Sequence, residues 1–196
     1  GTTFASLAPT PALYPGLNSA FGANGGLLFT FNTLDYSLKL SQCLGPNECA
    51  CPMPTPSLCR TLDSIASGGL PLTSILLKGA DTFPIMTYQE NNNDSLGYQH
   101  AKVRVLHCND ATCSAGTVSV VAKPLFASGT IYGPGNMIIG NDNLPALSYI
   151  DARVIVDPNG GPGYARYDLR FLNCGNAACT SGNTVRTLVP YAVLGA

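Results

Sequence analysis

Gly140-Asn141-Asp142-Asn143-Leu144-Pro145-Ala146-Leu147-Ser148-Tyr149 occurs in this chain in three variant copies. The stretch aligns without gaps on Gly79 to Tyr88 and on Gly22 to Phe31. Repeats of about 60 residues indicate stacked supersecondary units that share a core. The architecture is therefore interpreted one unit at a time.

A second block recurs in each unit after a loop of variable length. Leu169-Arg170-Phe171 precedes Cys174 as Val103-Arg104-Val105 precedes Cys108 and as Leu38-Lys39-Leu40 precedes Cys43. The alternation of apolar and basic residues is typical of a strand with one buried face. With an apolar stretch before the Gly-x-Asn/Asp turn and another after the cysteines, each unit predicts four short strands. Gly in this turn is expected to accept a positive φ, and Asn or Asp to hydrogen-bond the local backbone.

The predicted fold class is all-β, with three four-stranded antiparallel blade-like repeats in an incomplete β-propeller-like array. The predicted divisions are an N-terminal arm over 1–18, repeats over 19–66, 67–124 and 125–190, and a C-terminal tail over 191–196. The three repeats are expected to form one domain.

Charge is sparse in this sequence of 196 residues. Charged residues make up 11%, against about 25% for an ordinary soluble domain. Ten basic and eleven acidic side chains nearly cancel, so nothing favours a nucleic-acid partner. No apolar run approaches the roughly 20 residues that span a bilayer, so no membrane span is predicted.

Eight cysteines, an even number, predict four disulfides and an oxidising compartment. Cys108 is expected to bond Cys113, and Cys174 to bond Cys179, because turn formers separate each pair and strands flank it. The first repeat leaves two pairings open for Cys43, Cys49, Cys51 and Cys59. They are Cys43–Cys49 with Cys51–Cys59, or a Cys43–Cys59 bond that matches the other repeats more closely. A zinc site is not expected, because the pairs lie in separate units.

The run Gly140 to Tyr149, followed by Asp168-Leu169-Arg170-Phe171-Leu172-Asn173-Cys174, resembles a repeat of secreted bacterial proteins known as sialidase-like β-propellers. The resemblance covers most of residues 19–190 and implies a structural blade with a Cys-x4-Cys tip. The sialidase active site does not carry over. Arg104 and Arg170 match Lys39 in the repeat, which indicates a structural stripe instead of a carboxylate clamp, and the chain has only two glutamates, Glu48 and Glu90.

No catalytic residue, metal site or cofactor is predicted. His100 and His107 are interpreted as surface-loop residues. Amide and acidic clusters, such as Asn141 to Asn143 and Asp151 with Asp157, lack the spacing of a dedicated calcium loop. Asn93-Asp94-Ser95 is a candidate glycosylation sequon on a predicted loop.

Self-association is the leading functional prediction, because closed propellers generally need four to eight blades and three leave strand edges uncovered. The apolar C-terminal segment supplies the predicted assembly contacts, namely Val189, Tyr191, Val193 and Leu194. The start at Gly1 is read as that of a mature product without its leader, so the expected location is extracellular or at the cell surface. The predicted function is a non-enzymatic structural subunit of a filament or surface assembly. The alternative is a lectin-like propeller module whose Tyr36, Tyr88, Tyr149 and Tyr167 stack on glycans.

Overall fold

The structure is a computed structural model. It describes residues 18–21, 27–32, 37–43, 59–64, 73–77, 81, 83–93, 99–123, 129–132, 135–155 and 164–193. Every regular element within these ranges is a β-strand, so the all-β expectation is confirmed. The strands are β1 (Asn18–Phe21), β2 (Leu27–Asn32), β3 (Ser37–Cys43), β4 (Cys59–Ser64), β5 (Thr73–Leu77), β6 (Pro84–Asn93), β7 (Gln99–Cys108), β8 (Gly116–Ala122), β9 (Gly129–Tyr132), β10 (Met137–Ile139), β11 (Pro145–Ile155), β12 (Tyr164–Asn173) and β13 (Thr184–Val193).

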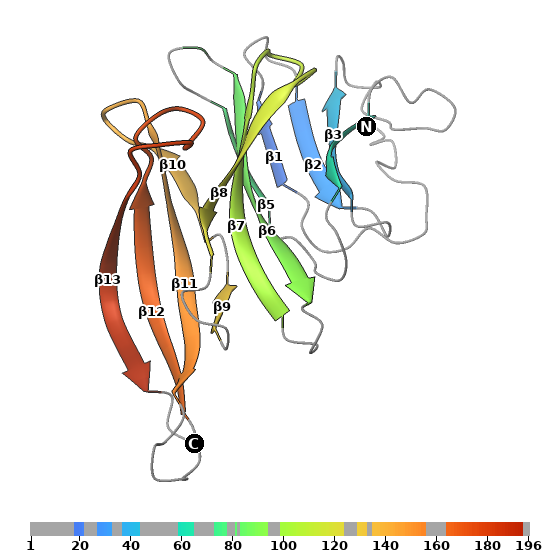
Figure 1. The fold of residues 1–196 in the computed structure, drawn as a ribbon. Coiled ribbons are helices and arrows are strands. Elements are labelled where there is room, and N and C mark those ends of the chain that lie inside the picture. The colour runs from blue at the N-terminus through green and yellow to red at the C-terminus, as the bar shows by residue number, and fades with distance from the viewer. Residues whose placement is uncertain are drawn as a thin grey trace, which may run out of the picture.

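These strands form three antiparallel sheets, one from each repeat (Figure 1). The first sheet has the order β1-β2-β3-β4 and the middle sheet the order β5-β6-β7-β8. The last sheet has the order β10-β11-β12-β13, and β9 also pairs with β11. The expectation of three four-stranded blades is therefore wrong for the last sheet, which has five strands. The sheets do not close into a ring.

The fifth strand arises because the edge of the last sheet is interrupted. β10 pairs with Pro145 to Leu147, and β9 pairs with Ile150 to Arg153 on the same strand. Between them, Gly135 N donates to Ser148 O at 2.9 Å, and Ser148 N donates to Asn136 O at 3.2 Å. A Cβ on Gly135 would lie 2.7 Å from Ser148 Oγ, so the backbone approaches β11 closely here. In the sequence Gly133-Pro134 separates the two strands, and proline cannot donate to a ladder.

The Gly-x-Asp turns form as predicted through the aspartate but not through the glycine. Asp142 Oδ1 accepts a hydrogen bond of 3.0 Å from Leu144 N, and Asp81 Oδ1 accepts one of 3.1 Å from Phe83 N. The positive φ in the last turn belongs to Asn143, at 61°. Gly140 leaves room for the Asp142 side chain, because a Cβ there would lie 2.7 Å from Asp142 Oδ1. The expectation of a positive φ at this glycine is therefore wrong.

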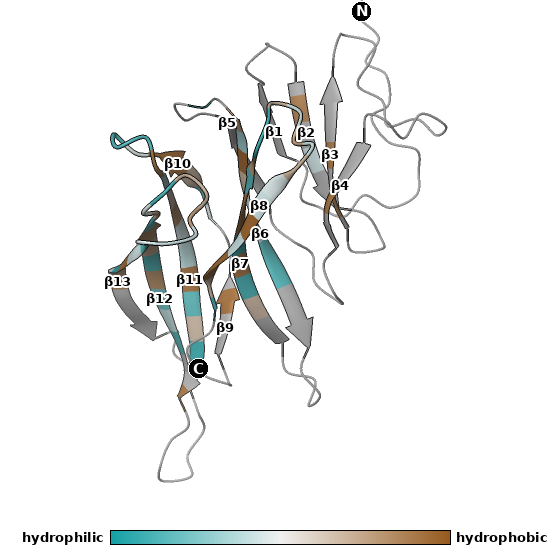
Figure 2. Cartoon of the chain, turned by 45° about the horizontal axis from the view of Figure 1, so that its top comes forward, coloured by the Kyte–Doolittle hydropathy of each residue, from teal (hydrophilic) through white to brown (hydrophobic). Residues whose placement is uncertain are grey.

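The middle sheet is buried on both faces, which gives the described residues two hydrophobic cores. Met86, Tyr88 and Leu106 pack with residues of the first sheet. Ile85, Val103 and Val105 pack with residues of the last sheet. Adjacent residues of β6 thus enter different cores, as the period of two in a strand requires. Figure 2 shows hydrophobic and hydrophilic segments alternating along the strands of the middle and last sheets.

Each sheet therefore has two distinct faces, named here by their order along the chain. The leading face points toward the preceding sheet, and the trailing face points toward the following one. In the middle sheet, Met86 and Tyr88 lie on the leading face, and Val103 and Val105 lie on the trailing face.

The repeat boundaries predicted from the sequence can be compared with the strands. The first sheet ends at Ser64, the middle sheet at Ala122, and β9 begins at Gly129. β13 continues to Val193, which pairs with Arg166, so residues 191–193 belong to the last sheet and not to a separate tail. The N-terminal arm lies outside the described residues, except for Asn18 at the start of β1.

Candidate functional site

Tyr88, Glu90 and Arg104 form a polar triad on the leading face of the middle sheet. Tyr88 lies opposite Arg104 in the ladder between β6 and β7. Arg104 Nε donates to Glu90 Oε2 at 2.6 Å. Tyr88 is fully buried and Glu90 is 5% exposed, while the Arg104 side chain keeps 24% exposure, so the carboxylate end of this ion pair is buried at the junction with the first sheet.

The last sheet repeats this triad with Tyr149, Asp151 and Arg170. Tyr149 lies opposite Arg170 in the ladder between β11 and β12, and Arg170 Nη2 lies 3.4 Å from Asp151 Oδ2. The repeat alignment matches each member of this triad with the corresponding member in the middle sheet. The prediction that Arg104 and Arg170 form a repeated stripe is thus supported by equivalent partners. Their carboxylate partners were missed, although an acid two residues after the tyrosine in Tyr88-Gln89-Glu90 and in Tyr149-Ile150-Asp151 is a visible signal.

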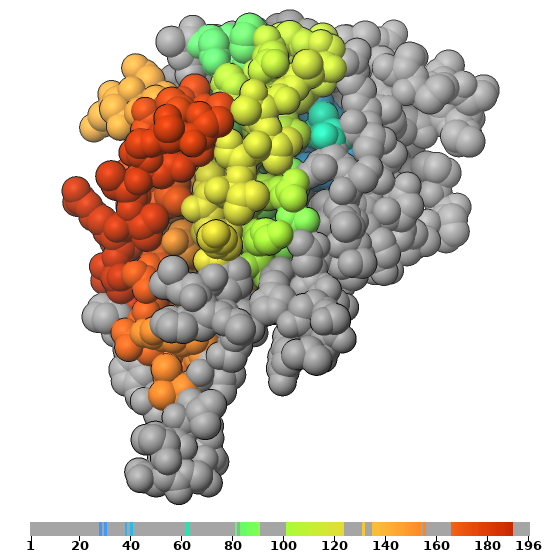
Figure 3. Space-filling view, viewed as in Figure 1, coloured from blue at the N-terminus to red at the C-terminus, as the bar shows by residue number. Residues whose placement is uncertain are grey.

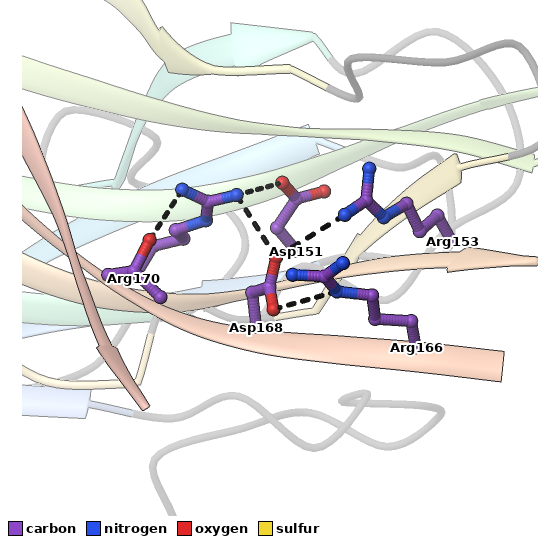
Figure 4. Close-up of polar contacts among 6 residues, drawn as sticks. Asp151, Arg153, Arg166, Asp168 and Arg170 are labelled. Carbon is purple, nitrogen blue, oxygen red and sulfur yellow. Dashed lines mark hydrogen bonds and ion pairs between the residues drawn. The ribbon is translucent and has the colours of Figure 1, made fainter. Parts of the chain in front are cut away.

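Asp168 extends the triad of the last sheet into a cluster of five charged residues (Figure 4). Its carboxylate lies 3.1 Å from Arg170 Nη2, 3.2 Å from Arg166 Nε and 3.9 Å from Arg153 Nη2. Asp168 is only 2% exposed. In the middle sheet the aligned residue is Lys102, so the last repeat has an acidic residue where the middle repeat has a basic one.

Asp151 and Asp168 lie directly opposite each other in the ladder. Burial raises the pKa of Asp151, and the charge of Asp168 adds to this effect, while Arg170 opposes it. Burial also raises the pKa of Tyr149, again against the influence of Arg170. Two facing carboxylates would repel each other, so the surrounding arginines are needed to keep them together.

Arg170 is the centre of this cluster and ties three strands together. Its Nη2 donates to the carboxylates of Asp151 and Asp168, and its Nη1 donates to Thr187 Oγ1 of β13 at 2.7 Å. Its Nε is buried and has no hydrogen-bond partner. The contacts of Arg170 therefore hold β11, β12 and β13 in register on the leading face of the last sheet.

The ion pairs with arginine limit what the two carboxylates of this cluster can bind or react with. Both acids are largely buried and bound to arginines of the same chain. Within the described ranges no group of three or more His, Cys, Asp and Glu side chains converges as metal ligands would. Buried ion pairs of this kind are weak evidence for added stability, because the cost of desolvating the two charges offsets their attraction.

The two predicted disulfides of the hairpin tips are confirmed. Cys108 bonds Cys113 and Cys174 bonds Cys179, with Cα separations of 4.8 Å and 4.7 Å. Their position is the unexpected feature, because these four cysteines are at most 3% exposed and belong to the two hydrophobic cores. Each disulfide therefore packs into a junction between sheets as well as closing a tip. Ser119 Oγ of β8 donates to Ala178 O at 2.7 Å, which joins the last tip to the middle sheet. Figure 3 shows the surface of the last repeat lying directly against that of the middle repeat.

A side chain at the same repeat position organises both tips. In the middle tip, Asp110 accepts hydrogen bonds from Thr112 N at 2.8 Å and from Ser114 N at 3.0 Å. It also accepts hydrogen bonds from the hydroxyl groups of Thr112 and Ser114. These bonds lower the pKa of Asp110 well below its ordinary value. In the last tip, Asn176 accepts from Thr180 N at 3.0 Å and donates to Thr180 and Ser181. The same turn is therefore built once with a charged and once with a neutral residue.

The remaining cysteines lie in the first repeat. Cys43 ends β3 and Cys59 begins β4, two adjacent strands in which Cys59 lies opposite Ser41. Cys49 and Cys51 lie outside the described residues. The choice between the two pairings therefore stays a prediction.

The two histidines and Asn93, the first residue of the glycosylation sequon, lie on strands. His100 and His107 both belong to β7, so the expectation of surface loops is wrong. His107 Nε2 lies 3.0 Å from Asp81 Oδ2 and connects β7 to the first turn of its repeat. Asn93 is the last residue of β6 and lies opposite Gln99. Its glycosylation stays a prediction.

The predicted assembly contacts fall on β13 and beyond it. Val189 is 53% exposed at the edge strand of the last sheet. Tyr191 and Val193 belong to β13, which pairs with β12, and Leu194 lies outside the described residues. Of the tyrosines considered for glycan stacking, Tyr88 and Tyr149 are buried, Tyr167 is half-buried and Tyr36 lies outside the described residues.

Comparison with known proteins adds no family to these observations. No family model matches the chain, and no curated protein matches it. The resemblance to sialidase-like repeats therefore stays an expectation. In the part of the chain that the structure describes, no helix is long and apolar enough to cross a membrane.

Proposed function

We propose that this chain is a non-enzymatic structural protein that assembles with copies of itself into an extracellular filament or another surface assembly. In this proposal the three sheets are blade-like units of an incomplete propeller-like array. The observation that carries it is the apolar trailing face of the last sheet. Ile138, Ile150 and Val189 are 54%, 37% and 53% exposed on this face.

The exposure is unusual because the corresponding faces of the other two sheets are covered. Leu38, Leu40, Val103 and Val105 are at most 2% exposed in the two cores. Surfaces that expose several neighbouring apolar side chains mark interaction sites in soluble proteins. Because the chain has few charged residues, charge repulsion between copies would oppose contact at this face only weakly.

The buried triads support the non-enzymatic part of the proposal. Glu90, Asp151 and Asp168 are 5%, 8% and 2% exposed, and each is paired with an arginine. A glycosidase needs two carboxyl groups that flank a substrate bond and reach it. The two disulfides that pack into the cores accord with an oxidising compartment.

Sedimentation of the purified wild-type protein over a range of concentrations tests this function. The expected result is a large or filamentous species that dissociates on dilution. Val189→Asp should shift the distribution toward small species, because it places a charge on the exposed face. Val118→Asp is the matched control, since Val118 is 40% exposed on β8 of the middle sheet.

A well-behaved monomer at high concentration would exclude the proposal. Binding in a glycan array by that monomer would then favour the lectin-like alternative. The burial of Tyr88 and Tyr149 argues against this alternative, because neither ring can stack on a sugar from within the core.

A further inference from the structure

The two sheet junctions inside the chain follow one rule. In the first junction, Leu28, Leu38 and Leu40 of the first sheet pack with Met86, Tyr88 and Leu106 of the middle sheet. In the second junction, Ile85, Val103 and Val105 of the middle sheet pack with Leu147, Tyr149 and Leu172 of the last sheet. The repeat alignment matches Leu28 with Ile85, Leu38 with Val103, and Leu40 with Val105. The same trailing positions therefore contact the same leading positions at both junctions.

Among the residues that the structure describes, no sheet follows the last one, so its trailing positions face no further sheet. The alignment matches Val103 and Val105 with Leu169 and Phe171, which are half-buried instead of fully buried. In the ladder, Ile150 lies opposite Leu169, and Ser148 lies opposite Phe171. Ile138 lies opposite Ala146, and Val189 opposite Leu169, so all of these share one face. This face has the composition of a junction, and none of the described strands packs against it.

The leading positions of the first sheet are the complementary half. Phe29 and Phe31 of β2 align with Met86 and Tyr88 and with Leu147 and Tyr149, the pairs that fill both internal junctions. The register supports this equivalence, because Phe31 lies opposite Lys39 as Tyr88 lies opposite Arg104. At the repeat position of Glu90 and Asp151 the first repeat has Thr33, which carries no charge. A contact at these repeat positions of the first sheet would therefore bury no third carboxylate.

We infer that the first sheet of a second copy docks on the trailing face of the last sheet, with Phe29 and Phe31 at the positions that Met86 and Tyr88 occupy inside the chain. This inference rests on the proposed self-assembly and specifies its interface. The contact joins two different surfaces, so each copy keeps one free surface of each kind. Such heterologous contacts either close into a ring or continue as a filament. The occupant is a copy of this chain because its first sheet has the matching pattern.

Two variants with one defective face each provide a sharp test. Ile138→Asp with Ile150→Asp blocks the last sheet, and both sites are exposed, so the fold should tolerate the changes. Phe31→Asp blocks the first sheet. Each change should raise the concentration required for assembly about tenfold or more, the factor that corresponds to about 1.4 kcal/mol. Val118→Asp is the control and should assemble like the wild type.

Mixing the two defective variants distinguishes this geometry from every symmetric one. Each variant retains the face that the other has lost, so an equimolar mixture should form a 1:1 pair and nothing larger. If the mixture stays monomeric while both variants retain wild-type circular dichroism, the head-to-tail contact is wrong.

A measurement on the wild type avoids dependence on the folding of Phe31→Asp. Arg186 is exposed and lies opposite Phe171. In the middle sheet the equivalent residue is Ser119, which lies opposite Val105 and is only 8% exposed because the last sheet covers that face. Arginine-specific dicarbonyl labelling of Arg186 should therefore fall severalfold on assembly. Assembly with unchanged labelling and with normal behaviour of Ile138→Asp/Ile150→Asp would overturn the inference but not the proposed function. A monomeric wild type would overturn both.

Discussion

Glu90 accepts a hydrogen bond of 2.6 Å from Arg104 Nε while only 5% of the glutamate is exposed. The pair lies on the leading face of the middle sheet, in line with the core residues Met86 and Tyr88. Its equivalent in the last sheet, Asp151 with Arg170, is longer at 3.4 Å because Arg170 also serves Asp168. Each of these junctions therefore has an arginine–carboxylate pair beside its apolar core, and in the last sheet Asp168 adds three further pairs.

Glu90→Ala is expected to lower the free energy of unfolding by roughly 3 kcal/mol, near the lower end for breaking a buried pair. The lower end applies because the Arg104 side chain keeps 24% exposure and can partly rehydrate. Urea denaturation at neutral pH measures the loss. Lys123→Ala, at an exposed position after β8, is the control and should change stability little. A loss below about 1 kcal/mol for Glu90→Ala would show that the pair is solvated in solution.

Asp168→Asn should destabilise the protein more than Asp151→Asn, because Asp168 contacts three arginines and Asp151 contacts one. The pKa of Asp151 is raised in the folded state. Its titration therefore contributes stability that is fully present below the ordinary pKa of about 3.9 and is lost as pH rises through the raised value. The stability difference between wild type and Asp151→Asn should accordingly shift in favour of the wild type as pH falls. Denaturation of both variants at several pH values checks the order and the direction.

Acid should loosen the middle tip but not the last one. The folded pKa of Asp110 is lowered by its hydrogen bonds, so its contribution is present above the ordinary pKa of about 3.9 and is lost as pH falls through the folded value. Asn176 holds the same position in the last tip and does not titrate. Amide exchange of Thr112 and Ser114, relative to the intrinsic rate at each pH, should therefore accelerate in acid, while that of Thr180 should not. Parallel behaviour of the two tips would contradict the assigned role of Asp110.

Gly175→Ala should cost more stability than Gly140→Ala. A Cβ at Gly175 would lie 2.5 Å from the backbone of Gly182, which cannot move aside without opening the tip. A Cβ at Gly140 would meet the Asp142 side chain at 2.7 Å, and that side chain can rotate. We expect losses of about 2–3 kcal/mol and about 1 kcal/mol respectively, within the range for overpacked sites. Thermal denaturation of the two variants gives the order, and equal losses would mean that the last tip is more adaptable than its geometry indicates.

Replacing Cys108 and Cys113 by serine should cost more than the approximately 2 kcal/mol that loop entropy predicts for so short a loop. The additional loss comes from placing two hydroxyl groups in the core between the first and middle sheets. A loss limited to the entropic value would show that the tip is independent of the junction. Denaturation with and without reductant, compared with the double variant, separates the two contributions.

Local sequence signals predicted the elements of this fold well. The Asp81 and Asp142 turns and the two Cys-x4-Cys tips depend on contacts within a few residues, so the spacing alone identified them. The interruption between β9 and β10 was missed, because a glycine and a proline in a short apolar segment leave open whether a strand resumes. The extension of β6 through Asn91 to Asn93 could not be predicted either, since such polar residues are not typical of strands.

The charged cluster was harder to predict than the strands. The repeat placed Arg104 and Arg170 at equivalent positions, but their partners depend on which residues of the neighbouring strand lie opposite. Asp168 aligns with Lys102, so comparison of the repeats hid its role instead of showing it. His107 was misassigned for a similar reason, because its partner Asp81 lies at the far end of the repeat.

The stacking of the sheets in the order of the chain has a consequence for how such a protein can change in length. The two cores each join sheets that are neighbours in sequence, so stability is a sum over units and their junctions. A whole unit inserted between Ala122 and Gly129 would offer one leading and one trailing face and would leave both ends of the array unchanged. Duplication of a unit is therefore a single genetic step that lengthens the array of sheets without requiring a new surface.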